Sequence, residues 1–195
     1  MNSVKEFFDS VAGNWDKREK KSYSELDSFI RKYVPISEGM KALDLACGTG
    51  VITNILYNIT KREIDAVDIS SEMIKCAISK NNNPDIHFRC DDFMNIKNIY
   101  DIIVCFNAFP HFIDVEAFRN KAYELLNENG YLVIIHNLSR KQLDSHHSFL
   151  SSDISRSLKP INEESLVFKG FFNTEEIIDN DEMILLSLRR GCKKT

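Results

Sequence analysis

The sequence predicts an α/β fold in which helices cover both faces of a seven-stranded, mostly parallel sheet. From Lys41 onward, short apolar runs of strand length alternate with amphipathic stretches of helix length. This rhythm is typical of a parallel sheet covered by helices. Near the C-terminus the alternation stops, and two strand-like runs follow each other with no long helix between them. These last two strands are therefore expected to form an antiparallel hairpin at the sheet edge.

The first forty residues are expected to be helical, because their apolar side chains recur at helical spacing. One stripe contains Val4, Phe7, Phe8 and Val11, and a second contains Leu26, Phe29, Ile30, Tyr33 and Val34. Pro35 and Gly39 are residue types that end helices, so the helical segment is expected to close there.

The alternating part predicts strands at residues 42–46, 64–69, 86–90, 100–106 and 131–136, and helices at 51–59, 71–80 and 115–126. Ser70 or Ser71 is expected to cap the second of these helices. Asn129 and Gly130 are expected to stop the third. The closing hairpin is expected from residues 165–172 and 183–189. Since no linker or internal repeat interrupts the pattern, residues 1–195 are expected to form a single domain.

Charge and cysteine content exclude several classes of protein. The formal net charge is −4, from 25 basic and 29 acidic residues, whereas a nucleic-acid-binding protein would show a basic excess. The five cysteines are odd in number and form no C-x-x-C pair, which favours a reducing compartment. The N-terminus is polar and amphipathic, and no apolar run approaches the length of a membrane span. We therefore expect a cytoplasmic protein that binds neither membrane nor nucleic acid.

The most informative stretch is the loop Leu-Asp-Leu-Ala-Cys-Gly-Thr-Gly at residues 43–50, which joins a predicted strand to a predicted helix. Gly48 and Gly50 tolerate the dihedral angles of a tight turn and allow a ligand to approach the backbone. The helix that begins near Val51 directs its first N–H groups and its positive dipole end at the loop. A nucleotide-like ligand is therefore expected at the carboxyl ends of the strands.

Three acidic residues support this interpretation. Asp44 precedes the glycine loop, Asp68 closes the next strand, and Asp91 follows the third. A carboxylate at residue 68 is suited to accept hydrogen bonds from two ribose hydroxyls, and one at residue 91 from an adenine amino group. A single such residue is usually only a turn former at a strand end. Three at successive strand ends beside a glycine loop favour a binding site.

These motifs resemble those of the class I S-adenosylmethionine-dependent methyltransferases, and the resemblance runs from Phe7 to Arg190. Residues 44–50 match the family's first motif, with Ala46 in place of the usual first glycine. Residues 68–74 and 91–93 match the second and third motifs. Phe7-Phe8-Asp9 and Trp15-Asp16 are similar to the lid segment of members that methylate small molecules. The resemblance implies a Rossmann-like fold whose seventh strand is antiparallel.

The resemblance also implies a division of the chain and a set of cofactor contacts. Residues 1–38 would form the lid, 40–136 the cofactor-binding core, and 137–195 the acceptor-side loop and the hairpin. Backbone groups near Gly48 would line the methionine part of S-adenosylmethionine, Asp68 would hold the ribose, and Asp91 the adenine. The implied cofactor-binding residues are Trp15, Tyr23, Asp44, Ala46, Cys47, Gly48, Gly50, Asp68, Ile69, Met73, Asp91, Asp92, Phe93, Phe106 and Asn107. For Trp15 and Tyr23, packing of the N-terminal helices is an equally open interpretation.

Four histidines near the ends of the fourth and fifth predicted strands are candidate catalytic residues, namely His111, His136, His146 and His147. In this family those strand ends border the acceptor pocket, so His136 or His111 is a candidate general base or acceptor contact. The alternatives are structural histidines and a metal site. Adjacent histidines rarely chelate one ion, and the spacing matches no zinc pattern, so no metal is expected.

The acceptor is expected to be a small molecule, and the chain a monomer or a homodimer. The N-P-P-Y sequence of adenine-DNA and glutamine-amide methylation is absent, as is the Pro-Cys pair of cytosine methylation. Two other functions stay open from sequence. One is a protein that binds S-adenosylmethionine without catalysis. The other is a nicotinamide-dependent oxidoreductase, for which Gly48, Gly50 and Asp68 form an incomplete dinucleotide pattern.

Overall fold

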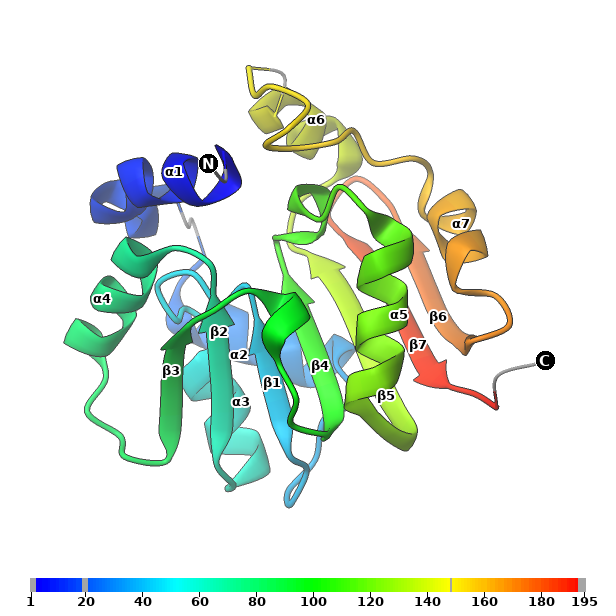
Figure 1. Cartoon of the computed structure of the whole chain (residues 1–195), viewed down its shortest axis with the longest axis horizontal. Coiled ribbons are helices and arrows are strands. Elements are labelled where there is room, and N and C mark those ends of the chain that lie inside the picture. Colours follow the sequence, from blue (N-terminus) through cyan, green and yellow to red (C-terminus); the bar gives the residue numbers. More distant parts are fainter. Residues whose placement is uncertain (1–2, 19–20, 148, 193–195) are drawn as a thin grey trace. The chain divides into compact units, whose positions relative to one another are not determined.

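The computed structural model describes residues 3–18, 21–147 and 149–192 (Figure 1). The chain divides into two compact units, Met1–Ile96 and Lys97–Thr195, which are described separately below. The first unit contains α1 (Ser3–Val11), η1 (Ala12–Arg18), α2 (Tyr23–Tyr33), β1 (Ala42–Leu45), α3 (Thr53–Thr60), β2 (Ile64–Asp68), α4 (Ser71–Lys80), β3 (Ile86–Cys90) and η2 (Phe93–Asn95), where η marks a 3-10 helix.

The three strands of the first unit lie in the order β3-β2-β1 and are all parallel. Ala42 of β1 is in register with Ile64 of β2, and Ile64 with Ile86 of β3. All four residues of β1 are buried, as expected for a parallel strand covered on both faces. Because parallel strands point the same way, the glycine loop after β1 and Asp68 at the end of β2 share one sheet edge.

Local capping explains where two helices of this unit begin. Ser22 and Glu25 form a reciprocal capping box at the start of α2. Ser70 caps α4 by accepting a hydrogen bond from the Met73 N–H at 3.1 Å. The predicted start of α4, including its serine cap, is therefore confirmed.

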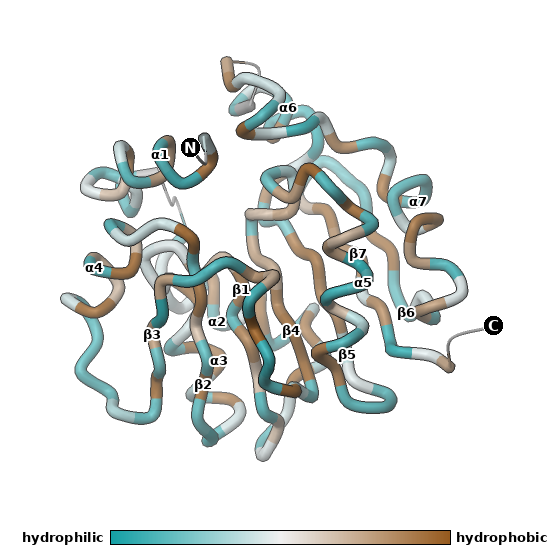
Figure 2. Tube along the Cα trace, viewed as in Figure 1, coloured by the Kyte–Doolittle hydropathy of each residue, from teal (hydrophilic) through white to brown (hydrophobic). Residues whose placement is uncertain are grey.

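The second unit contains β4 (Tyr100–Phe106), η3 (Phe109–His111), α5 (Val115–Leu125), β5 (Leu126–His136), α6 (Arg140–His147), α7 (Ile161–Glu164), η4 (Ser165–Phe168), β6 (Phe172–Asp179) and β7 (Ile184–Arg190). Its strands lie in the order β4-β5-β7-β6. The β4–β5 pair is parallel, whereas β7 is antiparallel to both β5 and β6. The apolar run of β4 is brown in Figure 2, and five consecutive residues from Ile102 to Phe106 are buried.

Asn129 and Gly130 do not stop the helix, which is a correction to the sequence prediction. Helix α5 ends at Leu125, and both residues lie inside β5. The ladder shifts between the pairs Tyr100–Leu126 and Ile102–Tyr131, so residues 127–130 form a bulge. Asn129 adopts a φ of 62°, and a Cβ at Gly130 would lie 3.0 Å from the Asp101 carbonyl oxygen. The two residues therefore serve this bulge.

The strand predicted at residues 165–172 is also wrong. Residues 165–168 form the 3-10 helix η4, and the first strand of the hairpin is β6, at Phe172–Asp179. Ser165 and Phe168 are buried at a spacing of one 3-10 turn, while Leu166 between them is 52% exposed. Strand β6 is mostly exposed and polar, so it carries no apolar alternation by which sequence reasoning finds strands.

Within the described ranges, no helix is long and apolar enough to cross a membrane. The five cysteines are all free thiols. Cys47 and Cys105 are buried, Cys76 is half-buried, and Cys90 and Cys192 are exposed.

Candidate functional site

The carboxylate of Asp68 is bound to the glycine loop. Its Oδ2 accepts the Gly48 N–H at 2.8 Å, and its Oδ1 accepts the Ser70 N–H at 2.8 Å. Asp68 is only 8% exposed, and this burial raises the pKa of its carboxyl, although the two N–H donors oppose the shift. A carboxylate oxygen that accepts one hydrogen bond keeps a second lone pair. The side chain is thus oriented to accept hydroxyl donors at the edge of the sheet.

The backbone of the glycine loop is tightly curved. Ala46, Gly48 and Gly50 have φ values of 55°, 54° and 78°, and the Gly50 N–H donates to the Cys47 carbonyl at 2.9 Å. A Cβ at Gly50 would lie 3.1 Å from ring atoms of Phe88, so this position requires glycine. Ala46 occupies the same left-handed region at a cost of about 1–2 kcal/mol, which explains why glycine is usual there.

Asp44 lies beneath the loop. It is 1% exposed, and its Oδ2 accepts the Thr53 hydroxyl at 2.6 Å. Burial raises the pKa of the Asp44 carboxyl to about 7; the Thr53 hydrogen bond opposes this shift, and the negative charge of Asp68 adds to it. Asp44 thus ties the end of β1 to the first residue of α3, and its carboxyl keeps a proton to a higher pH than an exposed aspartate does.

The third acidic motif forms its own turn. The Asp91 N–H donates to the Asp68 carbonyl at 3.0 Å, which joins the turn to the end of β2. Asp91 Oδ1 accepts the Asp92 N–H at 2.8 Å and the Asn95 side-chain amide at 3.0 Å. Asp92 caps η2 through the Met94 N–H, and Phe93 is buried.

Two aspartates of the N-terminal segment contact the loop and helix α4. Asp9 Oδ1 accepts the Ser70 hydroxyl at 2.7 Å and the Glu72 N–H at 3.2 Å, and Asp9 also pairs with Lys5. Burial alone would raise the pKa of Asp9, but the hydrogen bonds from Lys5, Ser70 and Glu72 outweigh burial and lower it to about 2. Sequence reasoning placed Asp9 in the lid motif but assigned it no contact.

The second aspartate, Asp16, bonds the Thr49 hydroxyl of the loop and accepts Lys80 Nζ of α4 at 2.7 Å. Next to it, Trp15 packs over the loop: a Cβ added at Gly48 would lie 3.7 Å from its Nε1. Trp15 also meets Phe8 edge-on, with ring centroids 5.4 Å apart. The segment α1–η1 is therefore held against the predicted cofactor loop.

The remaining predicted residues of this unit have different surroundings. Met73 is buried at 1% exposure, and Cys47 packs in an apolar cluster with Ala66, Ile74 and Phe88. Ile69 is half-buried, and its carbonyl receives the Cys90 thiol. Tyr23 is 52% exposed, and its hydroxyl bonds Asn58 in the last turn of α3, whereas the loop joins the first turn. The structure does not bring Tyr23 to the loop.

In the second unit, an asparagine pair joins the ends of β4 and β5. Asn107 Nδ2 donates to Asn137 Oδ1 at 2.8 Å, and the Asn137 N–H donates to Asn107 Oδ1 at 3.1 Å. Asn107 has a φ of 54°, which asparagine tolerates better than most residues, and its own N–H bonds the Ile135 carbonyl. Phe106, just before it, is 7% exposed.

The four histidines occupy unlike environments. His111 ends η3, and its Nδ1 lies 2.9 Å from the Ile154 carbonyl oxygen. His136 is completely buried at the end of β5, in register with Ile184 of β7. His146 is exposed on α6; the side chain of His147, the last residue of α6, lies outside the described residues. No cluster of three or more potential metal ligands occurs in the part of the chain that the structure describes.

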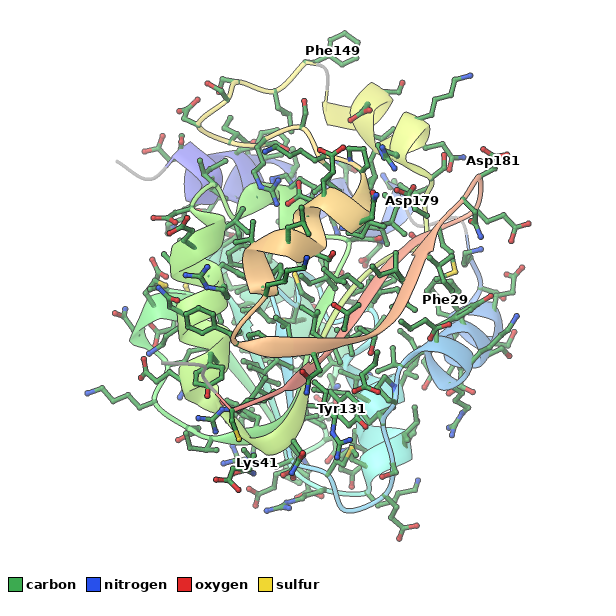
Figure 3. All side chains as sticks on the ribbon, turned by 90° about the vertical axis from the view of Figure 1, so that its right-hand side faces the viewer. Phe29, Lys41, Tyr131, Phe149, Asp179 and Asp181 are labelled. Atoms are coloured by element: carbon green, nitrogen blue, oxygen red, sulfur yellow. The ribbon has the colours of Figure 1, made fainter. Side chains whose placement is uncertain are left out.

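A shallow cavity of about 410 Å³ lies beside α6 and is lined by Ser139, Arg140, Lys141, Asp144, Asp179, Asn180 and Asp181. Figure 3 shows Asp179 and Asp181 at the turn between β6 and β7. Arg140 pairs with Asp179, which also accepts the Ile161 N–H at 3.2 Å. The Arg140 side chain therefore forms an ion pair within the protein, which favours a structural role for its charge.

A parallel sheet, a glycine turn and an acidic residue at the end of the second strand are the features of a Rossmann-like, nucleotide-binding fold. The profile of the methyltransferase domain family matches residues 36–169. The chain belongs to this family.

Known relatives agree with this assignment. The chain is 23% identical over 177 residues to the malonyl-[acyl-carrier protein] O-methyltransferase of Bacillus cereus, covering 88% of this chain and 65% of that protein. It is 29% identical over 152 residues to the Priestia megaterium enzyme of the same name, covering 75% of this chain and 54% of that protein. The chain thus spans less than two thirds of the length of these relatives.

Solved structures show the fold of nearly the whole chain. The N-methyltransferase NodS of Bradyrhizobium japonicum, in complex with S-adenosyl-L-homocysteine, aligns with a TM-score of 0.74 at 14% identity, covering 97% of this chain and 99% of that one. The magnesium protoporphyrin IX methyltransferase of Synechocystis, with bound S-adenosyl-L-homocysteine, aligns with a TM-score of 0.70 at 13% identity, covering 96% and 98%. The predicted fold class and the cofactor, S-adenosylmethionine, are confirmed.

Proposed function

We propose that the chain transfers the methyl group of S-adenosylmethionine to a small-molecule acceptor. The proposal rests chiefly on Asp68, whose nearly buried carboxylate bonds the N–H of Gly48 in the glycine loop. This arrangement suits a ligand that has two vicinal hydroxyls for the carboxylate and a chain that extends along the loop.

Residues of the first unit would hold the cofactor. Asp68 accepts the ribose hydroxyls, Gly48 and its neighbours Ala46 and Cys47 line the methionine part, and Asp91, Asp92 and Phe93 lie along the adenine. Met73 and Ile69 flank the base, while Asp44 organises the loop and, in its ionised form, attracts the ammonium group directly or through water. Trp15 covers the loop from the lid side. The bound cofactor supplies an electrophilic methyl group, so the protein has to orient the acceptor and exclude water.

His111 is our preferred base for an acceptor that must lose a proton. A carbonyl oxygen only accepts, so the 2.9 Å contact with Ile154 requires a hydrogen on Nδ1 of His111. In the neutral ring the basic lone pair is then on Nε2, which would receive the proton of an acceptor hydroxyl. His136 is completely buried, which favours a structural role for it. His146 and His147 are weaker candidates.

The net charge and the relatives support the choice of acceptors to be tested. A net charge of −4 does not favour a nucleic-acid substrate. The names of the Bacillus and Priestia relatives describe O-methylation of an acid carried on a protein, so a small carboxylic acid, free or carried as a thioester, belongs in the acceptor panel with phenols, thiols and amines.

Two measurements test the proposal. Calorimetry with S-adenosyl-L-homocysteine and with NAD is expected to show binding of the first alone. Radiolabelled S-adenosylmethionine is then offered with the acceptor panel, and product is expected from at least one class. Binding without turnover across the panel would support the non-catalytic alternative, and binding of NAD alone would support the oxidoreductase alternative.

A further inference from the structure

The segment that follows α6 runs along the turn that carries His111. Three successive residues of that turn each receive a contact from residues 154–156. The Arg156 N–H donates to the Pro110 carbonyl at 3.0 Å, and Arg156 Nε donates to the Phe112 carbonyl at 3.2 Å. Between them, the His111 ring bonds the Ile154 carbonyl at 2.9 Å. Residues 154–156 therefore bond the His111 ring and also the backbone carbonyls immediately before and after His111.

Arg156 is itself firmly anchored. One of its terminal nitrogens donates to Glu164 Oε1 at 2.6 Å, and the Glu164 side chain is 3% exposed. The same carboxylate oxygen accepts the Lys159 N–H at 2.9 Å. The guanidinium also lies 4.7 Å from the centroid of the Phe109 ring. Arg156 thus joins Phe109 and Phe112, on either side of His111, to Glu164 in α7.

A pair of this kind is a weak source of net stability, because removing two charges from water costs about as much as their attraction returns. What a planar guanidinium supplies is geometry, since its donors point in set directions. Here those donors reach Glu164 and the Phe112 carbonyl at once. The main effect of the arrangement is to set the position of residues 154–156 relative to the His111 ring.

We propose that Arg156 is a positioning residue that presents His111 to the methyl acceptor with its proton on Nδ1. This inference rests on the proposed function, because that function assigns His111 the role of general base. Arg156 fixes the backbone two residues after Ile154, and the Ile154 carbonyl then selects the ring tautomer whose Nε2 is basic. Sequence analysis offered no signal for this residue, since Arg156 lies 45 positions from His111 in a segment without a motif.

NMR of protein labelled with nitrogen-15 in its histidine rings tests the inference without any acceptor. The wild-type His111 ring is expected to be in the Nδ1–H form at a pH where it is neutral. In Arg156→Gln, the ring is expected to shift toward the Nε2–H form that imidazole prefers in water. Arg156→Lys keeps the charge beside Glu164 but has a single donor group, so it is expected to restore the Nδ1–H form only in part.

Arg119→Gln is the matched control. Arg119 donates to the Val167 carbonyl at 2.9 Å and stacks 4.2 Å from the Phe171 ring. Arg119→Gln therefore removes a carbonyl contact and a ring contact of the same kinds, but at residues outside the His111 turn. The His111 tautomer in Arg119→Gln is expected to match that of the wild type. If Arg156→Gln is too unstable to measure, Glu164→Gln weakens the same anchor and is expected to shift the tautomer in the same direction.

An unchanged His111 tautomer in every folded variant of Arg156 and Glu164 would overturn the inference. An equal shift in Arg119→Gln would overturn it too, because the effect would then be a general loss of packing. His111→Ala is a separate measurement: if it turned over at the wild-type rate, the proposed base would be refuted while the tautomer result stood. Calorimetry with S-adenosyl-L-homocysteine is expected to give wild-type affinity in Arg156→Gln, which assigns the change to the acceptor side.

Discussion

The backbone N–H of Gly48 donates to Asp68 Oδ2 at 2.8 Å, across a sequence separation of 20 residues. The glycine turn after β1 and the carboxylate that ends β2 therefore form one hydrogen-bonded unit. Since the Gly48 and Ser70 N–H groups each use one lone pair, one on each oxygen, the carboxylate keeps two lone pairs for two ligand hydroxyls.

Asp68→Ala is expected to weaken S-adenosyl-L-homocysteine binding by about 2 kcal/mol, the typical value of a hydrogen-bonded charged partner. Calorimetry measures the change. Asp85→Ala is the control, because Asp85 is exposed and bonds Tyr57, far along α3 from the loop. Equal affinity in Asp68→Ala and Asp85→Ala would refute the placement of the ribose.

Ala46→Gly is expected to stabilise the protein by about 0.5–1 kcal/mol, because relief of the left-handed strain exceeds the added entropy of the unfolded chain. Urea denaturation monitors the change. Ala77→Gly is the control: Ala77 lies inside α4 with helical backbone, so glycine there is expected to destabilise by about 1 kcal/mol. Destabilisation by both substitutions would contradict the strain at residue 46.

The raised pKa of the Asp44 carboxyl is expected to make the ligand-free protein more stable in mild acid than in mild base. Its folded pKa of about 7 exceeds the ordinary value of 3.8, so its contribution to stability is complete below the ordinary pKa and is lost as pH rises through the folded one. The loss is at most about 1.4 kcal/mol per pH unit. Thermal melts between about pH 5 and pH 8 measure the loss, because this range extends through the folded pKa. Asp44→Asn is expected to flatten the dependence, and an unaltered slope would count against a buried proton at this residue.

Asp9→Ala is expected to release the N-terminal segment α1–η1 from α4. The Glu72 N–H loses an acceptor, so its hydrogen exchange is expected to accelerate, and the emission of Trp15, the single tryptophan, is expected to shift to longer wavelength. Asp27→Ala removes an ion pair of similar exposure within α2 and serves as the control. Because the pKa of Asp9 is about 2, the contact is expected to persist until the pH falls through that value. Unchanged Glu72 exchange in Asp9→Ala would show that the aspartate is not what holds the segment α1–η1 against α4.

The local elements were largely predictable. Strands β1 to β5, helices α3 to α5 and the Ser70 cap all follow from apolar periodicity and from residue types that act within one turn. The predicted elements failed where the signal was absent or ambiguous. Strand β6 is an exposed edge strand, and the Asn129-Gly130 pair suits a bulge as well as a helix end.

The sequence by itself determined the fold class and the family, because glycines and acids at strand ends are dictated by backbone geometry close to them in the chain. Tertiary structure alone decided which distant groups meet: Asp9 with Ser70, 61 residues apart, Arg156 with the turn around His111, and the burial of His136 within its sheet. Such contacts depend on how whole elements pack, and a side chain that bonds a distant backbone carbonyl or hydroxyl needs no particular neighbour in sequence. That is why the loop and its carboxylate could be anticipated, whereas the residues that hold the segment α1–η1 and the His111 ring could not.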